Sequence, residues 1–260
     1  MIETHYQLNT PFSMALLTDL HGRPFTDVKD SLYKNLPEVI CICGDFMYGK
    51  RPEDGRSPLE EQVNVLPFLE MCTDLAPTYV SLGNHEWILD EKDLEEIEKT
   101  GARVLDNKWV ERDGAVIGGL TSAYVTYYRQ LRKNSSYEEQ YLSRRYKRLC
   151  RPAPQLTEAN WISEMPQGYR IMLSHHPEYW SSVKDMSVDL MLSGHTHNGQ
   201  FAYYSLKKGR RTGLWAPGQG WFPEYSSGVY ENGRLVVSAG LSNTAPVPRL
   251  FNPTQIVYIG

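Results

Sequence analysis

Ser193-Gly194-His195-Thr196-His197 stands directly after an apolar run at 188–192. The run is typical of a buried strand, and Gly194 is typical of a turn at its carboxyl end. Histidine is the commonest protein ligand for transition metals, and the end of a strand holds a ligand rigidly. A lone His-x-His motif would be a weak signal. The rest of the chain, however, repeats the same arrangement.

Four further apolar runs end in polar side chains of the same kind. The runs at 14–17, 39–43, 78–82 and 171–174 lead, in that order, to Asp19 and His21, to Asp45, to Asn84 and His85, and to His175 and His176. Six of the seven histidines therefore follow a buried strand directly. Ligands of α/β sheets gather beyond the carboxyl ends of strands, so we expect these side chains to lie together.

The collected side chains exceed what one ion needs. A structural zinc site takes four ligands and prefers cysteine, whereas two ions about 3.5–4 Å apart that share a carboxylate would use the full set. Nitrogen and oxygen ligands without thiolate favour Mn²⁺, iron, Zn²⁺ or Co²⁺ over a soft ion. We expect two divalent ions, with Mn²⁺ as the first choice.

Composition sets broad limits on the class of protein. The 260 residues are 41% hydrophobic and 22% charged, which is ordinary for a globular protein. The net charge of -4 gives no overall attraction to nucleic acid. We see neither a secretion signal nor the roughly 18 apolar residues that a membrane helix needs. We therefore expect a soluble cytoplasmic protein, with buried free thiols at Cys41 and Cys43. The oligomeric state stays open.

The chain in order predicts one α/β domain over residues 1–260. Three helices are expected at about 27–36, 58–75 and 90–100. An insertion at about 124–165 is expected to form a helical cap. Beyond His197 the sequence becomes rich in strands, with Asn232-Gly233 as a hairpin turn.

The motifs together resemble those of calcineurin-like metallophosphoesterases. The resemblance spans residues 14 to 197 and is carried by Asp19-x-His21, Gly44-Asp45, Gly83-Asn84-His85-Glu86, His175 and Gly194-His195-x-His197. The tail from Gly199 to Leu250 is similar to a bacterial branch whose last motif reads Gly-His-Thr-His-Gly-Gly-Gln; here Asn198 replaces the first glycine after the histidine. The resemblance implies a four-layer sandwich, two mixed β-sheets flanked by α-helices.

The resemblance also implies a role for each motif residue. The first metal would be held by Asp19, His21 and His197, the second by Asn84, His175 and His195, and Asp45 would bridge the two. His85 matches the non-ligand histidine that contacts the phosphate and protonates the leaving oxygen. The implied reaction is hydrolysis of a phosphodiester by a hydroxide that bridges the two ions. Two alternatives stay open, a phosphomonoesterase of the same fold and a non-catalytic metal-binding scaffold.

Several features leave the substrate open between a small molecule and a lipid head group. Glu86, where most relatives have Asp, is expected to orient His85. We favour a supporting role for His176 over metal ligation. The basic stretch at 129–151 is either a solvated face or a cap that attracts an anionic substrate or lipid surface. The aromatic loop at 213–228 either walls a substrate subsite or packs.

Overall fold

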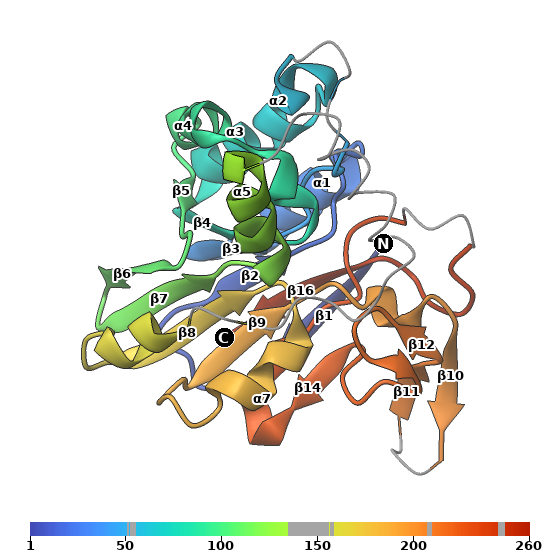
Figure 1. The fold of residues 1–260 in the computed structure, drawn as a ribbon. Helices are drawn as coiled ribbons and strands as arrows, with labels where there is room; N and C mark the ends of the chain where they lie inside the picture. The colour runs from blue at the N-terminus through green and yellow to red at the C-terminus, as the bar shows by residue number, and fades with distance from the viewer. Residues whose placement is uncertain (51, 53–55, 135–155, 157–158, 207–209, 244–247) are drawn as a thin grey trace.

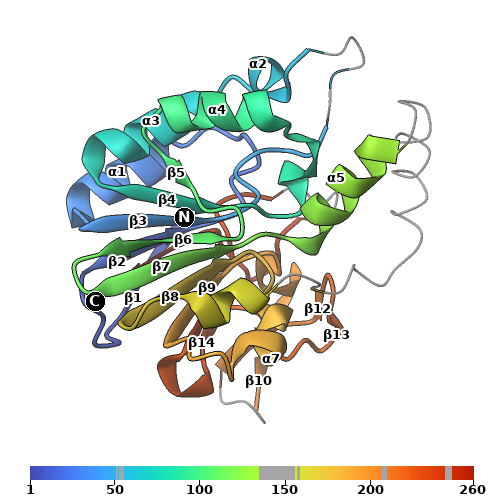
Figure 2. The ribbon, with the colours of Figure 1, turned by 60° about the vertical axis from the view of Figure 1, so that its left-hand side comes forward.

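The computed structural model describes residues 1–50, 52, 56–134, 156, 159–206, 210–243 and 248–260. Two six-stranded sheets lie face to face, and helices cover the outer side of each sheet (Figure 1, Figure 2). Both sheets are mixed, since each combines parallel with antiparallel pairs. The arrangement confirms the predicted four-layer sandwich.

The first sheet has the order β1-β16-β2-β3-β4-β5. Strands β2 to β5 are mutually parallel, whereas β16 runs antiparallel to β2 and brings the end of the chain into the sheet. Its strands are β1 (Ile2–Tyr6), β2 (Met14–Leu17), β3 (Val39–Cys43), β4 (Thr78–Ser81), β5 (Arg103–Val104) and β16 (Gln255–Ile259). The alternating pattern at Tyr6-Gln7-Leu8 predicts an edge strand there, whereas the observed strand β1 lies earlier and ends at Tyr6.

The second sheet has the order β14-β15-β9-β8-β7-β6. Strands β15, β9, β8 and β7 are mutually parallel, and β14 and β6 close the two edges as antiparallel hairpin partners. Its strands are β6 (Lys108–Arg112), β7 (Ala115–Leu120), β8 (Tyr169–Ser174), β9 (Leu190–Ser193), β14 (Gly228–Tyr230) and β15 (Leu235–Val237). The predicted Asn232-Gly233 hairpin is confirmed, with φ of 56° and 95° at its two residues.

Strand alternation divides the core into three apolar layers. On β3, Val39, Cys41 and Cys43 pack between the two sheets. Ile40 and Ile42 on the same strand face the helices outside. All five side chains are buried because both faces of the sheet are covered. Cys41 and Cys43 thus face the same way, as period-2 alternation predicts, and both are free thiols.

Helices flank each sheet (Figure 2). The outer side of the first sheet carries α1 (Thr26–Asn35), α3 (Val65–Leu75) and α4 (Glu91–Lys99), with α2 (Pro58–Glu61) beyond them. The outer side of the second sheet carries η2 (Asn160–Glu164), η3 (Pro177–Tyr179) and α7 (Trp180–Val183). None of the helices among the described residues is long and apolar enough to cross a bilayer.

The single helix predicted over 58–75 is wrong, since the structure breaks it into α2 and α3. Gln62 ends α2 with φ -99° and ψ 70°, and its side chain turns to the backbone of Tyr48. It accepts from Tyr48 N at 2.6 Å and donates to Tyr48 O at 2.7 Å. Pro67 fits only the first turn of a helix, because it lacks the N–H that a later turn requires. A new helix therefore begins at Val65.

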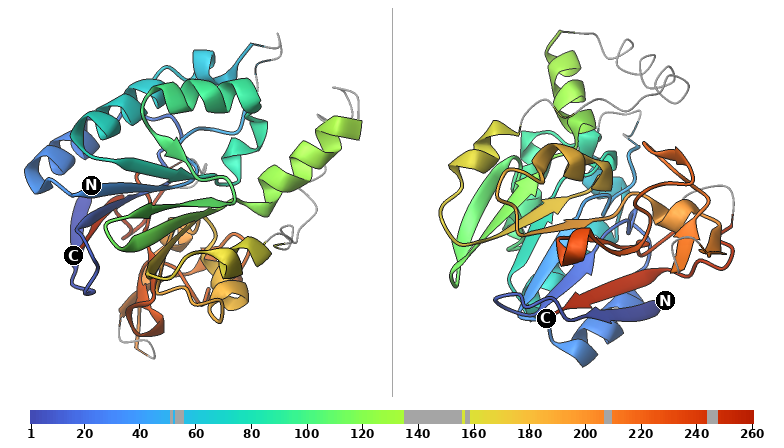
Figure 3. Two further views of the ribbon diagram at one scale, coloured as in Figure 1. Left: turned by 90° about the vertical axis from the view of Figure 1, so that its left-hand side faces the viewer. Right: turned by 90° about the horizontal axis from the view of Figure 1, so that it is seen from below.

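Two segments extend from the layers. Helix α5 (Ala123–Asn134) begins the predicted 124–165 insertion and projects beyond the sandwich (Figure 3). Most of that insertion, at 135–155, lies outside the described residues, and with it Cys150. After η4 (His197–Gly199) come the short strands β10 (Ala202–Ser205), β11 (Arg210–Gly213), β12 (Trp215–Ala216) and β13 (Gly220–Trp221), which pair as two hairpins beside the sheets (Figure 1).

Candidate metal centre

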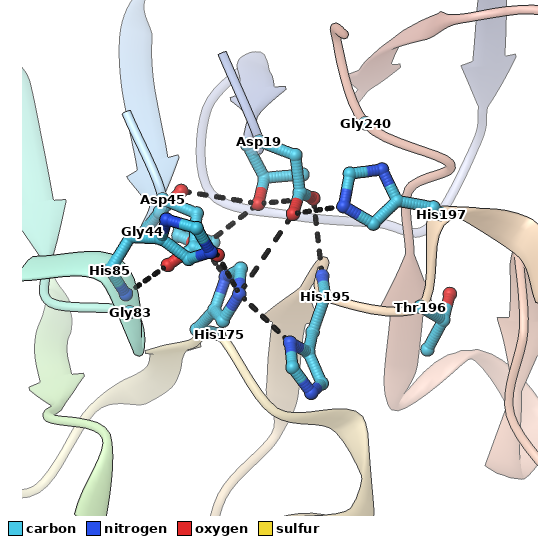
Figure 4. Close-up of polar contacts among 12 residues, drawn as sticks. Asp19, Gly44, Asp45, Gly83, His85, His175, His195, Thr196, His197 and Gly240 are labelled. Carbon is cyan, nitrogen blue, oxygen red and sulfur yellow. Dashed lines mark hydrogen bonds and ion pairs between the residues drawn. The ribbon is translucent and has the colours of Figure 1, made fainter. Parts of the chain in front are cut away.

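The polar side chains predicted from the sequence follow strands β2, β3 and β4 of the first sheet and β8 and β9 of the second. The strands within each set are parallel, so their carboxyl ends lie on one edge of the sandwich. Figure 4 shows the side chains of Asp19, Asp45, His175, His195 and His197 directed toward one another at this edge.

The ligating atoms form two main groups. Asp19, His21 and His197 make the first, and within it Asp19 Oδ1 lies 3.7 Å from His21 Nε2 and 3.4 Å from His197 Nε2. Asp45, His175 and His195 make the second. Within each group the ligating atoms lie no more than 4.8 Å from one another.

The two groups are joined through a carboxylate of each. Asp45 Oδ2 is 3.1 Å from His175 Nε2 and 3.8 Å from His85 Nε2. Asp45 also forms a cluster with His21 of the first group and with His85. Asp19 Oδ1 in turn lies 3.9 Å from His175 Nε2. The two groups therefore make one continuous cluster. We call Asp19, His21 and His197 the first group, and Asp45, His175 and His195 the second group.

The backbone is strained at these residues. Five of them adopt the left-handed region, with φ of 57° at Asp19, 52° at His21, 52° at Asp45, 68° at His195 and 45° at His197. Residues other than glycine rarely adopt this conformation, and each instance costs about 1–3 kcal/mol. The tight turns at the strand ends impose it, and they aim the side chains at a common centre.

Two glycines permit the close approach of these turns. A Cβ on Gly194 would lie 2.0 Å from Thr18 Oγ1 and 2.6 Å from Asp19 Oδ2. A Cβ on Gly83 would lie 2.4 Å from Asp45 Oδ1. Both positions are therefore closed to any side chain, which explains why the two motifs place glycine immediately before their ligands.

Buried polar atoms without partners test whether these residues suit metal ions. Asp19 Oδ1, His21 Nε2 and Asn84 Oδ1 are buried and have no hydrogen-bond partner. Buried polar groups ordinarily have a hydrogen-bond partner, and a bound metal ion would explain why these three atoms have none. Carboxylate and amide oxygens with imidazole nitrogens are a donor set for borderline divalent ions. The residues fit the implied metals.

A further hydrogen bond fixes the tautomer of His175. Its Nδ1 lies 2.7 Å from the carbonyl oxygen of Cys43, which can only accept, so Nδ1 carries the proton. Nε2 faces Asp45 and is the nitrogen that can ligate a metal once its proton is released. Backbone carbonyls commonly orient metal-ligating histidines in this way.

The charges of the metal-free cluster are distributed unevenly. Burial raises the pKa of Asp45, but the charges of His175 and His85 outweigh burial and hold it well below its usual range. Burial lowers the pKa of His175, yet Asp45 and Asp19 raise it to about 10. Burial lowers the pKa of His197 to about 4 against the opposing charge of Asp19. The first group thus offers a neutral imidazole, whereas His175 must release a proton before it can ligate.

His85 differs from the ligands in its contacts. The backbone N–H of Gly49 donates to His85 Nδ1 at 2.8 Å, so the neutral ring carries its proton on Nε2. Burial lowers the pKa of His85 to about 4, partly offset by the charge of Asp45. The ring is therefore neutral near pH 7 in the metal-free protein, with Nε2–H on the side of Asp45.

The expectation that Glu86 orients His85 is wrong. The Glu86 carboxylate is fully buried and accepts from the backbone N–H groups of Gly83 at 2.7 Å, Asp45 at 2.8 Å and Met47 at 3.3 Å. It therefore joins the turn after β3 to the turn after β4.

Sequence patterns assign no role to the residues of the tail that contact the first group. Ser242 Oγ donates to the carbonyl oxygen of Asp19 at 2.8 Å, and Asn252 Nδ2 donates to that of His197 at 2.6 Å. Arg249 Nη2 lies 2.8 Å from His197 Nδ1. The tail similarity had pointed to the segment around Arg249, but no local pattern assigns it to a ligand.

The remaining predictions have mixed outcomes. His176 Nε2 bonds to Ser122 Oγ at 2.7 Å, and its Nδ1 lies 3.3 Å from Glu178 Oε1, so a supporting role stays a prediction. Arg129 pairs with Asp106 at 2.5 Å, and most of the basic stretch lies outside the described residues. In the aromatic loop Tyr225 is buried, whereas Trp221 and Phe222 are exposed.

One cavity adjoins the first group. It has a volume of about 380 Å³ and is bordered by His21, Tyr48, Arg23 and Lys50. Tyr48 also lies against the His85 ring, with 5.2 Å between centroids. The cavity thus lies beside His21, whose ring meets that of His85 edge to face.

The chain thus combines a two-sheet α/β sandwich with a buried cluster of aspartate and histidine side chains at the strand ends. The sequence model of the calcineurin-like phosphoesterase family matches residues 12–199. The chain belongs to this family.

Similar proteins agree with this assignment. The uncharacterized metallophosphoesterase YkoQ of Bacillus subtilis is 27% identical over 206 residues, which cover 75% of this chain and 65% of YkoQ. Phosphodiesterase YaeI of Escherichia coli is 27% identical over 203 residues, which cover 73% of this chain and 62% of YaeI. The chain thus spans less than two thirds of the length of either relative. A dimetal phosphatase from Danio rerio has the same fold, with a TM-score of 0.51, 12% identity and coverage of 89% of this chain and 88% of that one.

Proposed function

We propose that this chain is a dinuclear metal-dependent phosphodiesterase. The observation that carries the proposal is the continuous cluster of two ligand groups joined through Asp45, with His85 beside it. Asp19, His21 and His197 would hold one ion, Asn84, His175 and His195 the other, and Asp45 both. Two divalent ions there, Mn²⁺ first, would polarise the phosphoryl oxygens and lower the pKa of a water nucleophile.

The chain's own residues supply the rest of the chemistry. His85 presents Nε2–H, which can donate a hydrogen bond to a phosphoryl oxygen and to the leaving alkoxide, so that negative charge on either is stabilised while water supplies the proton. The cavity beside His21 and Tyr48 would receive the ester group of a small molecule or lipid head group. Such help matters most when the leaving group is a poor alkoxide. On this ground we favour a diester over a monoester as the substrate. The name of YaeI supports the same choice.

The test is hydrolysis of a chromogenic phosphodiester and its monoester by metal-stripped protein reloaded with Mn²⁺. We expect diester turnover that requires metal and that falls about 10²–10⁴-fold in kcat in His85→Ala, with metal content unchanged. His5→Ala is the matched control, because His5 is exposed on β1 at the edge of the first sheet and should retain full activity.

Each other result points to an alternative. Preference for the monoester would make the chain a phosphomonoesterase of the same fold. Two tightly bound ions without turnover of either ester would favour the metal-binding scaffold.

A further inference from the structure

Arg249 is half-buried, and the hydrogen-bonding capacity of its guanidinium is only partly used. Its Nη2 contacts the carbonyl oxygen of Ser242 and His197 Nδ1. Its Nε and Nη1 are buried and have no hydrogen-bond partner. A guanidinium has five N–H groups, so three of them stay unpaired.

The protein supplies no anion for this cation. Among the described residues, no carboxylate oxygen lies within 4.0 Å of an Arg249 nitrogen, the limit for an ion pair. An arginine side chain is always protonated in a protein, so the group carries a full positive charge. A buried, unpaired charge is costly, and a structure that keeps one ordinarily has a ligand that completes it.

Support of His197 alone does not explain Arg249. One amino group already makes the contact to the ring, and an arginine always donates, so His197 Nδ1 accepts here. If Nε2 of this ring holds an ion, the ring proton must move to Nδ1, which can then no longer accept. The guanidinium of the metal-loaded protein would therefore have even more unpaired N–H groups.

We propose that Arg249 binds a non-bridging oxygen of the phosphoryl group beside the first group of ligands. A planar fork of N–H groups matches two oxygens of a phosphate, and such charge-assisted pairs are about twice as strong as neutral hydrogen bonds. The residue lies beyond the 12–199 that the family model matches, in the tail that Ser242 and Asn252 tie to the cluster. This inference rests on the proposed function only in taking the anion to be a phosphoryl group.

The experiment measures inorganic phosphate binding to Mn²⁺-loaded protein by calorimetry, with metal content determined on the same samples. We expect Arg249→Gln to weaken phosphate about 10–100-fold while metal content stays at the wild-type value, and Arg249→Lys to recover part of the loss. Arg234→Gln is the matched control. Arg234 donates to the carbonyl oxygens of Lys184 and Val188 at the opposite end of the second sheet, and its loss should leave phosphate binding unchanged.

The outcomes separate this inference from the proposed function. Phosphate affinity within twofold of wild type in Arg249→Gln overturns the inference, even if the wild type hydrolyses esters. Loss of metal in that variant also overturns it, because Arg249 would then act through His197. Arg249-dependent phosphate binding by a protein that hydrolyses no ester would support the inference and contradict the enzyme.

Discussion

The two groups of ligands are built differently. His175 of the second group is fully buried between the sheets, whereas the His197 side chain of the first group is 17% exposed, and His21 borders a cavity. The second group is supported by Cys43 at the end of β3 and by Glu86 in the turn after β4, and the first group by Ser242, Arg249 and Asn252 of the tail. We call the second group the sealed group and the first group the open group. On the proposed function, the sealed group would hold its ion rigidly, and the open group would be the place where substrate and ion meet.

The largest effect should follow removal of the shared carboxylate. Asp45→Asn is expected to lose both ions and to lower kcat on the order of 10³-fold or more, because metal ions contribute several kcal/mol to transition-state stabilisation. His197→Ala should lose only the ion of the open group. Metal stoichiometry by elemental mass spectrometry measures both variants. Two ions retained in Asp45→Asn would show that Asp45 does not join the groups.

The protonation of His175 makes the sealed group sensitive to pH, so stability measured over a pH series tests this group. Its pKa of about 10 lies above the unfolded value of 6.5, so in metal-free protein its contribution to the free energy of unfolding is complete below pH 6.5. The contribution is lost as the pH rises to about 10. Metal binding to the sealed group should release this proton, and affinity should rise with pH over the same range.

Urea unfolding of metal-free protein at pH 6, 8 and 10 measures the effect, with His175→Gln as control. The stability difference between wild type and the variant should shrink with rising pH. A difference that is constant over this range would contradict the charge assigned to His175.

The sequence predicts those residues of the site that directly follow a buried strand. Period-2 alternation places Cys41 and Cys43 together, and an apolar run followed by a polar turn locates Asp19, Asp45 and His195 without knowledge of partners. The tail contacts could not be predicted, because Ser242 and Asp19 are 223 residues apart in the chain. Chain geometry, not local propensity, brings such residues together.

Two other misses have local physical causes. Helical periodicity runs through 58–75, but the bond between Gln62 and Tyr48 and the backbone limits of Pro67 break the helix. Glu86 stands beside His85 in sequence, yet the turn directs its carboxylate to backbone amides that no side-chain pattern reveals.

Glu86 supports the sealed group, and its removal should chiefly affect stability. Glu86→Ala leaves three backbone N–H groups without an acceptor, at a cost of at least about 3 kcal/mol in the free energy of unfolding. Denaturant unfolding measures this loss. Glu38→Ala is the control, since Glu38 accepts from the backbone N–H of Ser13 at the surface and should cost less. If the two variants lost the same free energy of unfolding, the hydrogen bonds of the buried Glu86 would be worth no more than those of the exposed Glu38, and the supporting role of Glu86 would be contradicted.

The smallest effect tests the tail. Asn252→Ala removes the 2.6 Å bond to the carbonyl oxygen of His197 and should lower the free energy of unfolding by about 1 kcal/mol. It should also weaken the ion of the open group alone, because His197 loses a restraint on its strained backbone. Asn35→Ala removes a comparable side-chain bond within α1, to Ser31 O at 2.9 Å, and should leave both ions unchanged. If Asn252→Ala weakened the two ions equally, the tail would support the whole cluster, and the division into a sealed and an open group would not hold.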